Sequence, residues 1–314
     1  MENNEQKKST DIENEINLKE LFQALIDGKW IIGTIVMIAS VLVVIYSLSL
    51  PNIYQSRALL SPADSENGMS NSLGGMSSLA SLAGVNLAAQ SGQSNPIKAI
   101  EKLNTLSFFE ENILPYIFLP DLMAVKSWNL ANNKVEFDKN IYDESTDKWT
   151  REFTFPQKQI PSAQESFTKF QGDHLRISED KQTGFMSLVI KHQSPYIAKE
   201  WTELIVEQIN TFFREKDKAE AESAVNYLNQ QIANTRYTEI KQVMAELQQQ
   251  QIQKLTLIEA SDFYVFEYID PPAVMEKKSE PSRAMICIFG ALLGGMLGVL
   301  IVSARYLRSK STNS

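Results

Sequence analysis

The side chains that could carry acid–base, nucleophilic or metal chemistry are few and scattered in this 314-residue sequence. It has two histidines, His174 and His192, and a single cysteine, Cys287. One cysteine cannot form an intrachain disulfide or a cysteine metal cage, and two isolated histidines offer little to a zinc ion. We expect the histidines to be surface or sheet residues and Cys287 to be an apolar filler.

Catalytic motifs are missing as well. The sequence has no phosphate-binding G-x-x-x-x-G-K-[ST], no G-x-G-x-x-G, no H-E-x-x-H and no G-x-S-x-G. The acid pairs Glu110-Glu111 and Asp143-Glu144 lie in polar sequence, which is typical of a solvated surface rather than of a glycosidase. With 38 acidic and 30 basic residues, a net charge of −8 also argues against nucleic-acid binding. We therefore expect no catalytic residue, no cofactor, no metal and no nucleic-acid partner.

Two apolar segments divide the chain. No charged residue lies in 30–50 or in 284–304. A helix that rises about 1.5 Å per residue would be roughly 31 Å long in each case, which matches the hydrocarbon core of a bilayer. A cleaved signal sequence is an alternative for the first segment, and a buried core helix is one for either. The segments predict two transmembrane helices.

Basic residues predict how these helices are oriented. Lysines and arginines near the spans mark the cytoplasmic side, whereas long loops cross the membrane whatever their charge. We expect the tails 1–29 and 305–314 in the cytoplasm of a bacterium. Residues 51–283 would then form a periplasmic domain attached to the inner membrane. The basic residues of the two tails are Lys7, Lys8, Lys19, Lys29, Arg305, Arg308 and Lys310.

Glycines recur every four residues in the second apolar segment, at Gly290, Gly294 and Gly298. Small residues at this spacing let two helix backbones approach closely in lipid, although glycine is common in membrane helices in any case. We interpret the three as a helix-packing face. The sequence leaves its partner open between the first span, a neighbouring subunit and another membrane protein.

The longest helical pattern covers 196–262, which contains neither glycine nor proline. One helix of this length would reach about 100 Å, too long to be buried in a domain of this size. The apolar phase slips near 232–237, so the helix either breaks or projects and packs against other copies. We predict a projecting helix whose base, from Trp201 to Phe213, lies in the core. Contacts between subunits are expected at Val225, Leu228 and Ile232.

The rest of the outer domain predicts an α+β base. Strands are expected after Tyr54, in a hairpin over 174–191, and over 263–270, the last pairing with the first. Residues 121–160 look rich in loops, and short helices are expected after Pro96 and Ser162. The uncharged segment 67–97 is either a partly mobile insertion or a loop that packs on a neighbouring subunit. Three prolines, Pro271, Pro272 and Pro281, would stiffen the return to the membrane.

Motifs near both ends resemble those of bacterial polysaccharide chain-length determinant proteins, the Wzz-type co-polymerases. One departure is Val274-Met275, where the family tends to have a further proline. The first group of matching residues is Glu15-Ile16-Asn17-Leu18-Lys19-Glu20-Leu21, Lys29-Trp30-Ile31-Ile32 and Pro51-x-x-Tyr54-x-Ser56-x-Ala58. The second group is Ser194-Pro195-x-x-Ala198-x-x-Trp201, Asn210, Arg214, Tyr268-Ile269-Asp270-Pro271-Pro272 and Ser279-Glu280-Pro281.

The resemblance implies a non-enzymatic regulator of the length of O-antigen or a related surface polysaccharide. Its implied partners are an O-antigen polymerase, the growing glycan, the membrane and other copies of itself in a ring, which we expect to have more than four subunits. A capsule or exopolysaccharide co-polymerase that works with a separate kinase is the alternative. An export-pump adaptor would need a helical hairpin, whereas we expect a single helix and an extended return.

Overall fold

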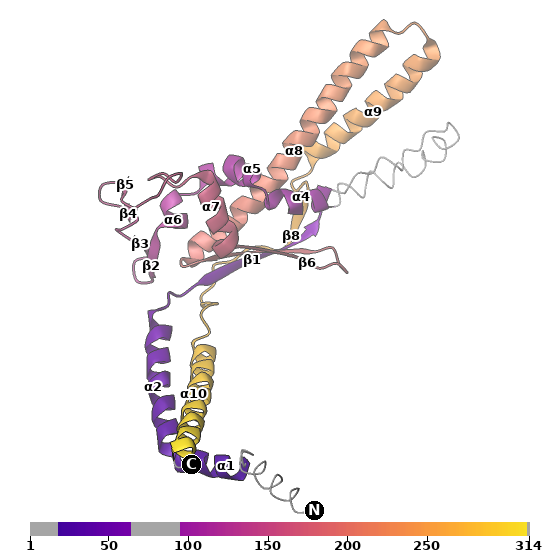
Figure 1. Cartoon of the computed structure of the whole chain (residues 1–314). Coiled ribbons are helices and arrows are strands. Elements are labelled where there is room, and N and C mark those ends of the chain that lie inside the picture. The colour runs from indigo at the N-terminus through magenta and orange to yellow at the C-terminus, as the bar shows by residue number, and fades with distance from the viewer. Residues whose placement is uncertain (1–17, 64–94, 313–314) are drawn as a thin grey trace, which may run out of the picture. The chain divides into compact units, whose positions relative to one another are not determined.

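The computed structural model describes residues 18–63 and 95–312 (Figure 1). Contacts divide the chain into two compact units, Met1–Asn52 with Ser279–Ser314, and Ile53–Lys278. We call the first the membrane unit and the second the mixed domain. Most of the uncharged segment 67–97 and the start of the N-terminal tail lie outside the described residues.

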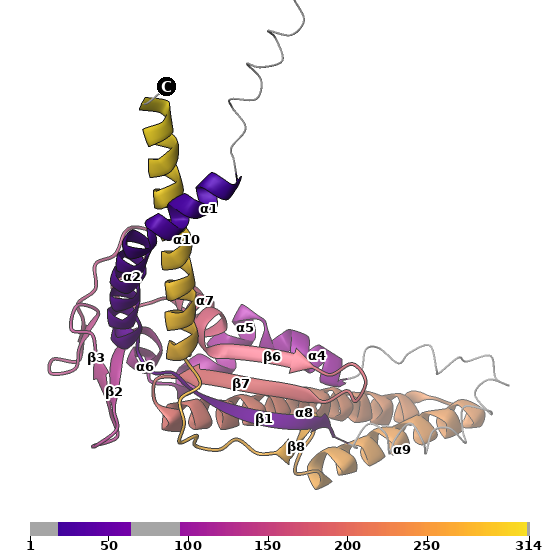
Figure 2. The same ribbon diagram turned by 90° about the horizontal axis from the view of Figure 1, so that it is seen from below.

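The membrane unit consists of three helices, α1 (Leu18–Asp27), α2 (Lys29–Ser49) and α10 (Arg283–Thr312). Helices α2 and α10 pack against each other along their length (Figures 1 and 2). Both are long and apolar enough to cross a membrane. The two predicted spans are therefore helices of suitable length and composition, and α10 continues past the predicted end at residue 304.

The mixed domain is built on a four-stranded antiparallel sheet in the order β6-β7-β1-β8. The strands are β1 (Tyr54–Pro62), β6 (Leu175–Glu179), β7 (Met186–His192) and β8 (Phe266–Asp270). The predicted hairpin is β6–β7, and the first and last strands pair as predicted, with Leu60 opposite Tyr268. Figure 2 shows the four strands side by side, with the lower part of a long helix, α8, across one face.

Alternation of side chains creates the core between this sheet and α8 (Pro195–Asn234). Every second residue of β7 is buried, because successive side chains of a strand point to opposite faces. The base of α8 contributes Trp201, Ile205, Ile209 and Phe213, all buried, as predicted for the 201–213 segment. Together with Phe108, Phe109 and Phe266 they form one apolar cluster.

The prediction of a single helix over 196–262 is wrong. Helix α8 ends at Asn234, and α9 (Thr238–Ala260) runs back beside it as an antiparallel hairpin (Figure 1). The register is fixed by a hydrogen bond from Gln248 Nε2 to Asn229 Oδ1 (2.7 Å) and by an ion pair between Lys218 and Glu259. The break between the helices falls where the apolar phase slips. The apolar residues before and after this point cannot lie on one face of a single helix, and folding back lets those of α8 and α9 cover each other. The expected absence of a helical hairpin was the argument against an export-pump adaptor, and this argument is therefore no longer valid.

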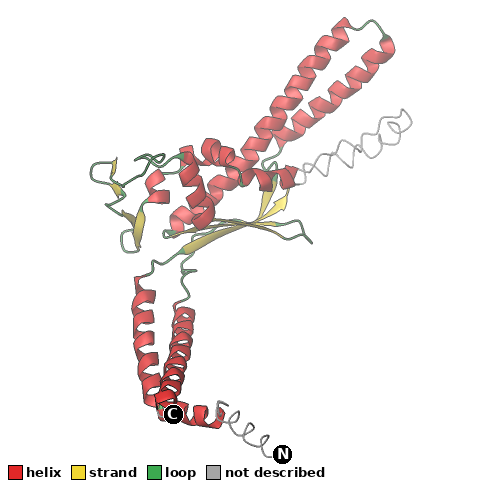
Figure 3. Cartoon of the chain, viewed as in Figure 1, coloured by secondary structure: helices red, strands yellow, loops and turns green. Residues whose placement is uncertain are grey.

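Smaller elements cover the remaining part of the core (Figure 3). Helix α7 begins after Ser162, whose hydroxyl accepts the N–H of Glu165, as expected of a cap. The 121–160 segment contains two small two-stranded sheets rather than loops alone. In chain order the elements are α4 (Asn95–Leu103), α5 (Leu106–Phe108), η2 (Phe109–Ile113), η3 (Leu114–Tyr116), α6 (Leu119–Met123), β2 (Val125–Asn129), β3 (Lys134–Phe137), β4 (Tyr142–Asp143), β5 (Lys148–Trp149), α7 (Ala163–Lys169) and η4 (Phe170–His174). The mixed α+β class with flanking apolar helices is confirmed.

Candidate functional site

The three spaced glycines of α10 face α2 of the same chain. A methyl group at Gly294 would lie 2.7 Å from Ala39 Cβ, and one at Gly298 would lie 3.2 Å from the backbone Cα of Ile32. Gly290 faces Val43 in the same way. The distances at Gly290 and Gly294 are shorter than real Cβ contacts, and the distance at Gly298 is tighter than most, so the absence of a side chain lets the two backbones approach. Of the three partners that the sequence left open, the structure places the first apolar helix here.

The close contact extends one turn further, to Val302, which is buried. It packs on Gly28, where an added Cβ would lie 2.6 Å from a Val302 methyl carbon. Gly28 separates α1 from α2, so this contact ties the junction of those helices to α10. Gly28 was not predicted from the sequence. It lies four residues before Ile32, the residue that packs on Gly298, and this four-residue spacing is a signal that could have identified it.

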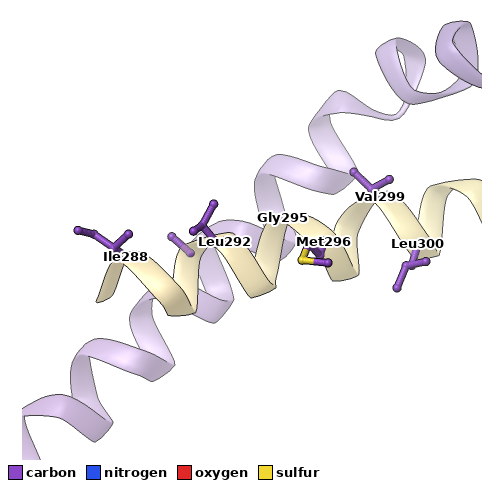
Figure 4. A pocket seen from close by; sticks show the side chains of 7 residues that line it. Ile288, Leu292, Gly295, Met296, Val299 and Leu300 are labelled. Atoms are coloured by element: carbon purple, nitrogen blue, oxygen red, sulfur yellow. The ribbon is translucent and has the colours of Figure 1, made fainter. Parts of the chain in front are cut away.

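The opposite side of α10 is an apolar surface around Gly295 (Figure 4). At Gly295 an added Cβ would meet only Val36 Cγ2, at an ordinary 3.9 Å. The neighbouring side chains of Leu292 and Met296 are 59% and 65% exposed. A surface of this composition suits the hydrocarbon of a bilayer.

Asn210 holds the segment that leads from α9 into β8. Its Oδ1 accepts the backbone N–H groups of Tyr264 (3.2 Å), Val265 (2.7 Å) and Phe266 (3.0 Å). Its Nδ2 donates to the carbonyl oxygens of Val206 (3.0 Å) and Phe266 (3.1 Å). Both ends of the buried amide are therefore satisfied by main-chain groups, as a buried polar group requires.

Two further polar side chains follow on the same face of α8. One Nη of Arg214 donates to the carbonyl oxygens of Ser261 (2.6 Å) and Asp262 (2.7 Å). The carboxylate of Asp217 accepts the hydroxyl of Tyr264 (2.6 Å) and also the side-chain amide of Asn95 (3.0 Å). We call Asn210, Arg214 and Asp217 the return clamp.

The return clamp gives a structural role to two positions that resemble the chain-length determinant family. Asn210 and Arg214 were among the positions that carried it, whereas Asp217 was not singled out. All three continue, at steps of four and three residues, the face of α8 that is apolar at Val206 and Phe213, which lie four residues before Asn210 and Asp217. Polar residues that extend an apolar helix face in register are the sequence signal for such a clamp.

The three prolines occupy different units. Pro271 and Pro272 follow β8 directly in the mixed domain, and Pro272 is buried. The hydroxyl of Ser56 donates to the next carbonyl, that of Ala273 (3.1 Å), which holds this segment beside β1. Pro281 lies in the membrane unit, where its carbonyl accepts the N–H of Arg283 (2.9 Å) at the start of α10.

The residues expected at subunit contacts, Val225, Leu228 and Ile232, are half-buried in the single chain. In the described part of the chain, α9 is the element that runs beside this stretch of α8 (Figure 1). Their burial therefore comes from α9, and so does that of the fully buried Ala221 below them. Their role between subunits stays a prediction.

A different stripe is left uncovered on α9. Ile240, Val243, Leu247 and Leu257 are 45%, 56%, 41% and 42% exposed, and they recur at steps that keep them on one helix face. The sequence analysis did not separate this stripe from the one that packs on α8, because both lie in the same helical pattern.

The acid pairs do not form a reactive site. Glu110 and Glu111 are exposed on η2. Asp143 accepts the hydroxyls of Ser145 and Thr146, and these hydrogen bonds lower the pKa of its carboxyl. Its carboxylate thus stabilises a turn. Among the described residues, no three His, Cys, Asp or Glu side chains gather in a way that could hold a metal ion.

The fold and its sites define a class: a chain with two candidate membrane helices that flank a mixed domain bearing a helical hairpin. Residues 14–108 match the family model for chain length determinant protein, Wzz. The resemblance seen in the sequence is confirmed.

Two solved structures match the chain at low sequence identity and low TM-score. A structure described as a full-length bacterial polysaccharide co-polymerase is 16% identical, with 94% of this chain and 99% of that chain covered and a TM-score of 0.40. A fragment of WzzB, a polysaccharide co-polymerase from Salmonella Typhimurium, is 13% identical, with 73% and 100% covered and a TM-score of 0.28. Among curated proteins, no relative of the chain is found.

Proposed function

We propose that this protein sets the length of a surface polysaccharide, and that the polysaccharide is the O-antigen of lipopolysaccharide. The observation that carries the proposal is the match of residues 14–108 to the chain length determinant family. In this role the protein makes and breaks no bond itself. It acts with a membrane O-antigen polymerase, whose growing glycan would be the second partner.

The return clamp supports a role without catalysis. The hydrogen bonds of Asn210, Arg214 and Asp217 are made to the chain's own backbone and side chains. The cluster therefore holds the hairpin on the sheet.

The inner membrane of a bacterium is the proposed location. The 21-residue α2 and the uncharged part of α10, 284–304, each match the thickness of a bilayer core, and basic residues lie at their ends, at Lys29, Arg305 and Arg308. Residues 1–29 and 305–314 would be cytoplasmic, with 51–283 in the periplasm.

Assembly into a closed ring of more than four copies completes the proposal. The exposed α9 stripe, with Ile240, Val243 and Leu247, supplies an apolar surface that a second copy can cover. Val225, Leu228 and Ile232 would then contribute mainly by holding α9 against α8. A ring gathers several polymerase or glycan contacts and raises their effective concentration.

Deletion of the gene tests the function. We expect the lipopolysaccharide ladder on a gel to lose its preferred length, and a plasmid copy of the gene to restore it. Capsule and exopolysaccharide are measured in the same strains. An unchanged ladder together with altered capsule would contradict the O-antigen assignment and support the kinase-linked alternative.

A further inference from the structure

His192 joins three elements of the mixed domain through its ring. It is the last residue of β7 and is 2% exposed. Its Nδ1 accepts the backbone N–H of Ser194 (2.9 Å), and its Nε2 lies 3.0 Å from the carbonyl oxygen of Asp121 on α6. A backbone N–H only donates and a carbonyl only accepts, so the ring is neutral and carries its proton on Nε2.

Ser194 makes this ring important for α8. It is the cap of that helix, and its hydroxyl accepts the N–H of Ile197 (3.5 Å). The same residue therefore fixes the first turn of α8 with its side chain while its own N–H is held by His192. The hydrogen bonds link β7, α6 and the start of α8.

The ring nitrogen of His192 that could take a second proton already accepts a hydrogen bond. Nδ1 is the one ring atom free to take a proton, and it is the atom that accepts from Ser194. Protonation must therefore break that hydrogen bond and place a positive charge at the N-terminus of α8, where the helix dipole disfavours it. We propose that His192 is an acid-sensitive latch, whose protonation releases the first turn of α8 from β7 and α6.

The rings packed on His192 carry no negative charge. His174 stacks on it with ring centroids 5.6 Å apart, and Trp201 lies 5.2 Å away, edge-on. His174 itself donates from Nδ1 to the carbonyl of Lys191 (2.7 Å). The other titratable groups of this region are the carboxyl of Asp121 on α6 and that of Glu200 on α8; Lys169, Asp173 and Arg176 lie around His174.

The sign of the effect follows from these groups. Burial lowers the pKa of His192 from 6.5 to about 4, so its stabilising contribution is complete above pH 6.5 and is lost as the pH falls toward 4. Burial also lowers the pKa of His174, with the same sign. Asp121 opposes them, because burial and then Glu200 raise the pKa of its carboxyl to about 6, and its unfavourable charge is relieved below that pH.

Hydrogen exchange in the full chain, held in lipid nanodiscs, tests the latch. We would follow the amides of Ser194 and Ile197 from pH 7.5 to 5.5, corrected for the pH dependence of chemical exchange. When the first turn of α8 opens, His192 regains its ordinary pKa of about 6.5. This opening should therefore be roughly tenfold more frequent at pH 5.5, one unit below that value. The amides of α9, far from the latch along the hairpin, serve as the internal reference.

Two variants decide the outcome. His192→Gln keeps an acceptor for Ser194 and a donor for Asp121 but cannot take up the proton, so its loss of protection in acid should be much smaller than in the wild type, with only the opposed effects of His174 and Asp121 remaining. Asp121→Asn removes the opposing carboxyl and keeps the backbone carbonyl, so its loss of protection should be at least as large as in the wild type. The proposal would be overturned if the wild type and His192→Gln lost equal protection at acid pH. It would also be overturned if neither the wild type nor Asp121→Asn lost protection. The result is independent of the proposed control of glycan length.

Discussion

At the scale of single residues, the side chain of Asn210 makes five hydrogen bonds to the main chain. One amide oxygen accepts three consecutive backbone N–H groups, at the start of β8 and in the two residues before it. Sequence composition gives no hint of this, since an asparagine in a long helix is ordinary. The burial of the whole arrangement is what makes it valuable.

Asn210→Ala should therefore destabilise the mixed domain strongly. Each buried group left without a partner costs about 1–3 kcal/mol, so the loss should be at least about 3 kcal/mol. Thermal unfolding followed by fluorescence should show a midpoint lower by roughly 6 °C or more. Gln230→Ala, at an exposed position of the same helix, is the matched control and should change little. Similar midpoints for the two variants would contradict the role given to the clamp.

At the scale of elements, the helix pair α2–α10 depends on glycines that a side chain would push apart. Gly294→Leu would drive atoms into Ala39 and the backbone of Val36, whereas Gly295→Leu would meet open space beyond Val36 Cγ2. Leucine keeps both helices apolar, so insertion should survive. We expect only the first change to separate the helices and to impair length control.

Spin labels measure this directly. Labels at Met37 and Met296, both exposed, report the distance between α2 and α10 when Cys287 is replaced by Ser. The distance distribution should lengthen and broaden in Gly294→Leu and match the parent in Gly295→Leu. Equal distributions in all three proteins would mean that the glycine face does not determine the packing.

The α8–α9 hairpin gives a second prediction for an element. Leu228 is half-buried toward α9, whereas its neighbour Tyr227 is 62% exposed. A charge at position 228 costs about 1–3 kcal/mol, so Leu228→Asp should raise hydrogen exchange of the α9 amides about tenfold or more. Tyr227→Asp should leave them protected. In both variants the base of α8, near Ile205, should stay protected, and a uniform loss there would contradict a separable hairpin.

At the scale of the whole molecule, the uncovered α9 stripe predicts how copies associate. Val243→Asp places a charge on the exposed apolar face, and so it should reduce the mass of the particle measured by light scattering in detergent while the hairpin remains folded. Lys241→Asp, at an exposed position outside the stripe, is the control. A wild-type protein that is monomeric or dimeric and fully active would contradict the ring.

Membrane topology is the second property of the whole molecule. Basic residues near both spans lead us to expect cytoplasmic termini. A reporter that is active only outside the cytoplasm should be silent when fused after Ser314 and active when inserted after Leu130, an exposed residue of the mixed domain. The reverse pattern would contradict the proposed orientation.

The sequence by itself determined the features that repeat along the chain. Two uncharged segments, the alternation in β7 and the helical periodicity of α8 all follow from local spacing, and so does the pairing of the first and last strands. The four-residue spacing of Gly290, Gly294 and Gly298 indicated a packing face in the same way. All of these except the strand pairing are properties of neighbours in sequence, which periodicity reports directly, whereas the pairing was inferred from two strand-like segments that each adjoin a membrane span.

Only the tertiary structure decided which surfaces meet. One helical pattern over 196–262 contained both the stripe that packs on α8 and the stripe left open on α9, and periodicity cannot tell them apart. The break at Thr235–Tyr237 became favourable because α9 could cover Val225 and Leu228. The ring of His192 likewise bonds to Asp121, which is 71 residues away in sequence, and to Ser194, which is two residues away. Contacts of this kind depend on the free energy of burial in three dimensions, which the order of residues along the chain does not display.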